Sequence, residues 1–232
     1  MFLRSVSLAL ALFGAACAFA QETARPLQAS ELWSSVGVQG SLPGFFKSRV
    51  PSTTAKRIRL AAEVGYRSAD VFFAGRQIYT DLGGRFKISD HLSVGLEHRI
   101  AFRGQGSTRH RSGLQVMYDT EWKRMKLDYR LNYQHNYRDF GGQREMFRNR
   151  FGLEYNIPKF KFDPAVSAEF FTWAGYMGWR YTGVRYKMGT TWSITKAHSI
   201  DLSVVHDREV GIAWPTHRWI CSVSYTMDLR KL

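Results

Sequence analysis

The 232-residue chain has almost no cysteine and, after its first twenty residues, no long apolar run. Its two cysteines are Cys17 and Cys221, so residues 21–232 hold one thiol and cannot form an internal disulfide. No run in that region approaches the ~20 apolar residues that a transmembrane helix requires. A disulfide-stapled fold and a helical membrane protein are both excluded, so a membrane-embedded chain would have to cross as strands.

The N-terminus has the organisation of a cleaved export signal. Arg4 is followed by an apolar stretch over 6–16 and by the small-residue pattern Ala18-Phe19-Ala20. The stretch is too short to anchor the chain in a bilayer. We expect a signal peptide over residues 1–20 and, because no Pro-rich, Ser-rich or low-complexity linker follows, a single domain over 21–232.

Positive charge is in excess, with 33 Lys and Arg against 19 Asp and Glu and a formal net charge of +14. Loss of Arg4 with the signal would leave +13. Such a surplus favours anionic partners, whether nucleic acid, lipopolysaccharide phosphates or small anions. Export argues against nucleic acid, and the charges recur at every second residue instead of forming one stripe, so we expect no nucleic-acid partner.

Strict alternation of apolar and polar residues is the strongest pattern in the chain. It runs without a fault through 125–138 and recurs over 92–103, 147–157 and 217–229. Period-two alternation indicates half-buried strands. These segments are longer than most strands of soluble proteins and match the ~9 to 11 tilted residues that cross a bilayer.

The connections between these segments alternate in kind, short at 89–91, 119–120, 158–159 and 195–198, and longer at 104–109, 139–145, 174–178 and 209–215. Short periplasmic turns and longer outer loops are typical of transmembrane barrels. We therefore predict an all-β, antiparallel up-and-down transmembrane barrel of about 12 strands, with 10 to 14 possible. An even count requires a short strand at 69–75, puts both termini in the periplasm and makes 41–55 the longest external loop. Aromatic residues at strand ends, Trp33 among them, are expected to form interfacial girdles.

A soluble exported β-sandwich or a lipocalin-like barrel would show the same alternation. Charged residues in the middle of strands, such as Arg130 and Arg150, favour the membrane barrel, because a small barrel can hold them in its lumen.

The predicted lumen face is rich in charge and defines our candidate site. A paired network that stiffens a small barrel is one interpretation, and a narrow path that favours anions is the other, since arginine exceeds the acids. We expect no enzymatic activity, no cofactor and no metal. The lumen-lining candidates are Arg59, Glu63, Arg85, Glu97, Arg99, Asp128, Arg130, Arg148, Arg150, Glu154, Glu169 and Arg185.

An alternative of another class is a lipid acyl hydrolase with a Ser/His pair at the barrel rim. If 104–109 closes a hairpin in which opposed residue numbers sum to about 212, Ser112 faces Ile100 and lies one diagonal step from His98, with His110 nearby. A hydroxyl beside an imidazole is the minimum for general-base activation of a nucleophile. An acidic partner is missing from that face, because alternation turns Glu97 inward.

The order of these features resembles the bacterial outer-membrane family known as domain of unknown function 2490. The likeness lies in the early Trp33 strand and in the segments 86–92 (FKISDHL), 126–133 (KLDYRLNY), 148–155 (RNRFGLEY), 167–171 (SAEFF) and 185–187 (RYK). It covers nearly all of residues 21–232.

The resemblance implies a barrel in the outer membrane of a Gram-negative bacterium and no particular activity. The expected partners are outer-membrane lipid and lipopolysaccharide, the barrel assembly machinery and small anions.

Overall fold

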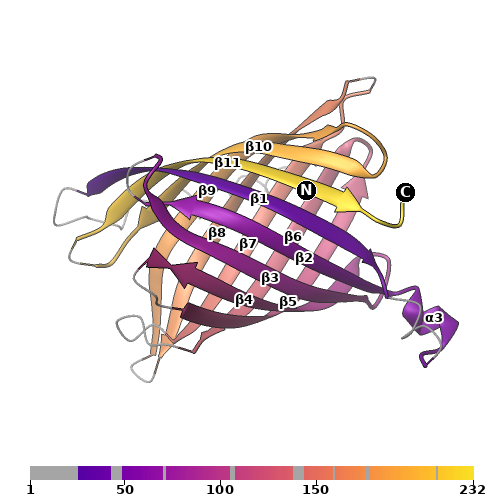
Figure 1. Cartoon of the computed structure of the whole chain (residues 1–232), viewed down its shortest axis with the longest axis horizontal. Helices are drawn as coiled ribbons and strands as arrows, with labels where there is room; N and C mark the ends of the chain where they lie inside the picture. The colour runs from indigo at the N-terminus through magenta and orange to yellow at the C-terminus, as the bar shows by residue number, and fades with distance from the viewer. Residues whose placement is uncertain are drawn as a thin grey trace, which may run out of the picture.

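In the computed structural model, a single closed sheet of eleven strands makes up the described part of the chain (Figure 1). The structure describes residues 26–42, 49–69, 72–104, 108–137, 144–158, 160–175, 178–212 and 214–232. The predicted signal peptide lies outside these residues. The strands are β1 (Leu27–Ser41), β2 (Ile58–Ser68), β3 (Gly75–Lys87), β4 (Leu92–Arg103), β5 (Thr108–Trp122), β6 (Met125–Asn136), β7 (Glu145–Tyr155), β8 (Phe162–Gly175), β9 (Gly178–Ser193), β10 (His198–Glu209) and β11 (Thr216–Asp228).

Each strand from β1 to β10 pairs antiparallel with the next one in sequence. The barrel therefore has two distinct ends. One, here called the loop end, carries the connections 69–74, 104–107, 137–144, 176–177 and 210–215; the other, the turn end, carries 88–91, 123–124, 156–161 and 194–197. The connections predicted as turns and those predicted as loops fall at opposite ends of the barrel, but the predicted difference in length does not hold throughout. The connection 156–161 at the turn end has six residues, and 176–177 at the loop end has two.

Closure of the sheet is parallel. β1 pairs with β2 on one side and with β11 on the other, and the β1–β11 ladder runs in the same direction from Leu27↔Thr216 to Gln39↔Asp228. The prediction of a closed barrel with 10 to 14 strands is confirmed. The expectation of purely antiparallel order and an even count is wrong, because there are eleven strands and β1 pairs with β11 in parallel.

The discrepancy arises at 69–75. Ser68 pairs directly with Gly75, and the backbone N–H of Ala69 donates to the carbonyl of Ala74 at 2.6 Å. Ser68 and Gly75 are thus the ends of the β2–β3 hairpin, and the described residues between them, 69 and 72–74, are not in a strand. Because the count is odd, β1 starts at the same end as β11, so the first strand begins at the loop end and not beside the C-terminus.

The described residues of the segment 41–55, which are 41–42 and 49–55, also lie at the opposite end from the one predicted. β1 ends at Ser41 and β2 starts at Ile58, and both positions are at the turn end. The short helix α3 (Ser52–Ala55) projects from this end (Figure 1), where the C-terminus also lies. The segment predicted to be the longest external loop is therefore a connection at the turn end.

Apolar side chains lie on the outer face of the barrel and polar ones on the inner face, which is the reverse of the arrangement in a water-soluble protein. Leu96 and Met188 point outward and are 67% exposed, whereas Glu31 and Asn132 point inward and are buried. Alternation along every strand sorts the two kinds of side chain onto opposite faces. The β-sandwich alternative is wrong, because one sheet closes on itself.

No helix within the described ranges is long and apolar enough to cross a membrane.

Candidate functional site

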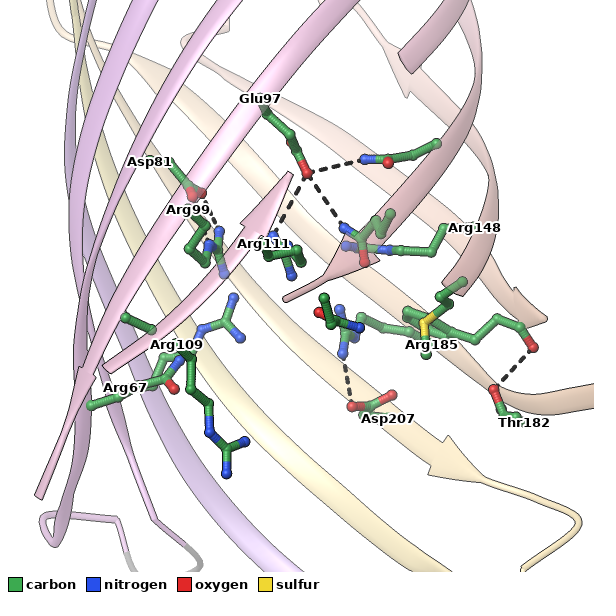
Figure 2. A pocket seen from close by; sticks show the side chains of 18 of the residues that line it. Arg67, Asp81, Glu97, Arg99, Arg109, Arg111, Arg148, Thr182, Arg185 and Asp207 are labelled. Carbon is green, nitrogen blue, oxygen red and sulfur yellow. Dashed lines mark hydrogen bonds and ion pairs between the residues drawn. The ribbon is translucent and has the colours of Figure 1, made fainter. Parts of the chain in front are cut away.

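A cavity of about 610 Å³ opens inside the barrel toward the loop end. Its lining has nine arginines and five carboxylates, which gives a net charge of +4. Figure 2 shows arginines from several strands that converge on this space. The arginines are Arg67, Arg99, Arg103, Arg109, Arg111, Arg130, Arg148, Arg185 and Arg208; the carboxylates are Glu63, Asp81, Glu97, Asp207 and Glu209.

Two smaller cavities continue from it through the lumen. One of about 280 Å³ shares Arg67, Arg130 and Arg185 with the large cavity. Another of about 260 Å³ lies nearer the turn end, where Arg59 and Arg85 line it. Glu63 lines all three. Among the described residues, the lumen therefore contains adjoining spaces of a few hundred Å³ each.

Glu169 on β8 gathers three arginines from three strands. Its carboxylate accepts hydrogen bonds from Arg148 at 2.7 and 3.1 Å and from Arg130 at 3.3 Å. Arg185 lies 3.6 Å away. Glu169 is only 5% exposed, and a buried carboxylate needs such compensation because it has lost its water. This cluster links β6, β7, β8 and β9 across the lumen.

Glu97 on β4 forms a second cluster. Its Oε1 accepts from Asn132 at 3.2 Å and from Gln134 at 3.3 Å, and lies 3.6 Å from Arg111. Gln115 donates to its other oxygen. Gly113 provides the room, since a Cβ there would lie 2.8 Å from Glu97 Cγ.

Two arginines at the cavity wall are held by aspartates. Arg99 pairs with Asp81 through two hydrogen bonds, and Arg185 Nη2 donates to Asp207 at 2.8 Å. Bidentate contact with a carboxylate fixes a guanidinium in place. These pairs orient the arginines and leave other N–H groups toward the cavity.

Arg67 on β2 has no carboxylate partner among the described residues. Its guanidinium lies 3.9 Å from the Trp33 ring centroid and 5.1 Å from that of Tyr79, both cation–π contacts. The prediction that Trp33 belongs to an interfacial girdle is therefore wrong, because its ring faces the lumen. An aromatic face stabilises the cation but does not neutralise it.

Several of these arginines keep unused donors. The Nε atoms of Arg67, Arg111, Arg130 and Arg185 are buried and have no hydrogen-bond partner in the described structure. Arginine has five N–H donors that suit carboxylate, phosphate and other oxyanions. The cavity can therefore offer both charge and donors to a small oxyanion.

The remaining predicted lumen residues lie on the inner face toward the turn end. Asp128 is 3.8 Å from Arg150, Glu154 is 3.7 Å from Lys126, and Arg85 Nη2 donates to Asp119 at 3.0 Å. Here these charges pair locally, whereas the lining of the loop-end cavity has four more arginines than carboxylates.

Sequence reasoning missed Arg67, Asp81 and Asp207 as lumen residues. Alternation along β3 and β10 places the two aspartates on the inner face. Arg67 is the second-last residue of β2, where the strand end is not marked by the alternating pattern.

The rim Ser/His candidates meet on the outward face. Ser112 lies directly opposite His98 and not opposite Ile100, because opposed residues of β4 and β5 sum to 210 and the predicted register was off by two. His98 Nδ1 is 2.9 Å from Ser112 Oγ. His110 faces Ile100, and its ring centroid is 5.7 Å from that of His98.

Within the described ranges, no three His, Cys, Asp or Glu side chains are grouped so that they could hold a metal ion. The family model described as a protein of unknown function (DUF2490) matches residues 30–212. No match was found among curated proteins.

Proposed function

Because the chain belongs to the DUF2490 family, whose function is unknown, we propose a function from the barrel itself: it spans the outer membrane of a Gram-negative bacterium and offers a narrow lumen that favours anions. The observation that carries this proposal is the pairing of an apolar outer face with a lumen of net positive charge.

The outer face supports the membrane part of the proposal. Leu82 and Val64 are 54% exposed, Leu114 50% and Val166 47%, and all point away from the lumen. Monomeric soluble proteins rarely expose contiguous apolar surfaces of more than a few hundred Å². In lipid the same surface is favourable, and the closed sheet leaves no unpaired edge.

Strand length supports it as well. The strands have 11 to 16 residues, and ~9 to 11 tilted residues span the hydrocarbon core. The predicted export signal would deliver the chain to the compartment from which bacterial barrels are inserted.

The charge of the loop-end cavity supports anion preference. Its nine arginines outnumber five carboxylates, and rings of Arg and Lys are the usual means by which pores select anions. The clusters around Glu169 and Glu97 keep the lumen narrow, so a permeant ion would pass within reach of guanidinium donors.

Planar-bilayer recording tests the pore. Purified protein should give small, discrete conductance steps. In a KCl gradient, the reversal potential should be shifted toward the equilibrium potential of chloride and away from that of potassium. Cation preference, or no conductance from protein whose gel migration is heat-modifiable, would overturn the proposal.

Fractionation tests the location. The protein should sediment with the outer membrane and resist carbonate extraction. Recovery in the soluble periplasmic fraction would contradict the membrane assignment.

A further inference from the structure

A row of polar side chains crosses the apolar outer face near the loop end. His98 (β4), Ser112 (β5), His135 (β6) and Glu145 (β7) are successive cross-strand partners. Together they form one line over four adjacent strands, on the surface opposite the lumen.

The next outward row toward the turn end is apolar or aromatic. Leu96 faces Leu114, which faces Tyr133, which faces Phe147. Leu96 is 67% exposed and Leu114 50%. On β4 and β5, Ile100 and His110 are the next outward residues toward the loop end. On β6 and β7 the row reaches the strand ends, because His135 is one residue before the end of β6 and Glu145 is the first residue of β7. In a membrane this end of the row would approach the depth of lipid headgroups and their ester linkages.

Ser112 has the contacts of a nucleophile. Its Oγ is 2.9 Å from His98 Nδ1 and 3.1 Å from the hydroxyl of Tyr137. With the His98 proton on Nε2, Ser112 donates to Nδ1 and the imidazole can take that proton as general base. The Tyr137 hydroxyl lies within reach of an oxyanion that develops on a carbon bound to Oγ.

The two remaining residues of the row, His135 and Glu145, hold Tyr137 in position. His135 Nδ1 is 2.6 Å from Glu145 Oε1, and the Tyr133 hydroxyl donates to the same carboxylate. Tyr137 meets the His135 ring edge-on, with centroids 5.0 Å apart, and the Tyr137 N–H donates to the His110 carbonyl at 3.1 Å. His135 and Glu145 are thus positioning residues, since the hydrogen-bond partners of Ser112 Oγ in the described structure are His98 and Tyr137.

We propose that this row is a hydrolytic site for acyl esters of membrane lipids. Ser112 Oγ attacks the ester carbonyl carbon while its proton passes to His98, and Tyr137 donates to the oxyanion. The bond from the carbonyl carbon to the alkoxy oxygen breaks, and the His98 proton goes to the leaving alcohol. Water then attacks the acyl-serine and gives one of its protons to His98; Ser112 leaves with that proton, and a fatty acid is released.

Ester cleavage at this row depends on the proposed function only in that the barrel must lie in a membrane. The lumen arginines take no part in the cleavage, so loss of lumen conductance would not abolish ester cleavage, and loss of ester cleavage would not abolish conductance.

The test uses folded protein in detergent and a serine-directed fluorophosphonate probe, with intact-mass and peptide mapping. Wild-type protein should be labelled at Ser112, and Ser112→Ala should not be labelled. His98→Gln should slow labelling about 100-fold, since general-base catalysis contributes at least that factor. His206→Gln is the matched control: it removes another histidine, stacked on Trp219 at 4.4 Å, and should label as wild type does.

Turnover is measured with vesicles of phosphatidylethanolamine and phosphatidylglycerol. Wild-type protein should release fatty acid, and Ser112→Ala should not. Absence of both labelling and release in wild-type protein with heat-modifiable migration would overturn the proposal, as would labelling or release that survives Ser112→Ala. Bilayer recordings on the same preparation show separately whether the lumen conducts.

Discussion

Leu32 of β1 lies opposite Cys221 of β11 in a parallel ladder, and this ladder closes the barrel. Cys221 is exposed on the outer face, and Leu32 shares that face because Trp33, the next residue, points into the lumen. Parallel neighbours on one face can approach closely enough for a disulfide, which needs Cα atoms roughly 4.4 to 6.8 Å apart.

Leu32→Cys in a Cys17→Ala background should therefore form a disulfide with Cys221 under mild oxidation. The bond would be detected by non-reducing peptide mapping of folded protein. Val36→Cys is the control, since its partner is Tyr225 and it lies four residues farther along β1. Equal cross-linking of both variants, or none at position 32, would argue against parallel closure of an eleven-strand barrel.

Glu169→Gln should destabilise the barrel by about 3 to 5 kcal/mol, because it leaves Arg148, Arg130 and Arg185 without their shared carboxylate. Denaturant unfolding of refolded protein measures the change. Glu154→Gln is the control; its contact with Lys126 at 3.7 Å is half-exposed, and its loss should cost less than about 1 kcal/mol. Similar losses for the two variants would mean that the Glu169 cluster is not the main electrostatic support.

Arg67→Gln should weaken anion preference while the fold is kept. Arg67 has no carboxylate partner among the described residues, so its removal orphans no acid and lowers the cavity charge from +4 to +3. We expect the chloride-to-potassium permeability ratio to fall by roughly half, measured by reversal potential in a KCl gradient. Lys123→Gln removes a charge from a turn outside the lumen and should leave the ratio unchanged. An unchanged ratio in Arg67→Gln would show that this charge does not act on the permeant ion.

Gly189→Ala should disturb the β9–β10 ladder. A Cβ there would lie 2.4 Å from the Leu202 carbonyl oxygen and 2.9 Å from Ser203 Cα. Both are backbone atoms, which cannot rotate away from the clash as the end of a flexible side chain can. We expect the free energy of unfolding to fall by about 1 to 3 kcal/mol. On a gel, the band of the folded protein should therefore disappear at a lower heating temperature than in wild type. Gly104→Ala, which meets nothing within 4 Å, should behave as wild type, and matching temperatures for the two variants would contradict the predicted clash.

The sequence by itself determined the strands and their two faces. Alternation at Arg130, Arg148 and Arg150 has one physical solution, a sheet with charge on one side and apolar groups on the other. The succession of hairpin connections from 88 to 215 assigned each connection to one of two ends. The Ser112–His98 proximity was also within reach, because a hairpin restricts opposed positions to a few registers.

Tertiary structure alone decided how the barrel closes and where charge remains unpaired. The choice between eleven and twelve strands depends on whether Ser68 pairs with Gly75, a long-range energy difference that local pattern does not encode. The same holds for Trp33, whose ring turns inward to Arg67, and for Glu169, which takes three arginines. Ion pairs across a closed lumen join residues that are far apart in the chain. The positions of the charged residues in the sequence therefore did not reveal which arginines would keep N–H groups without a hydrogen-bond partner.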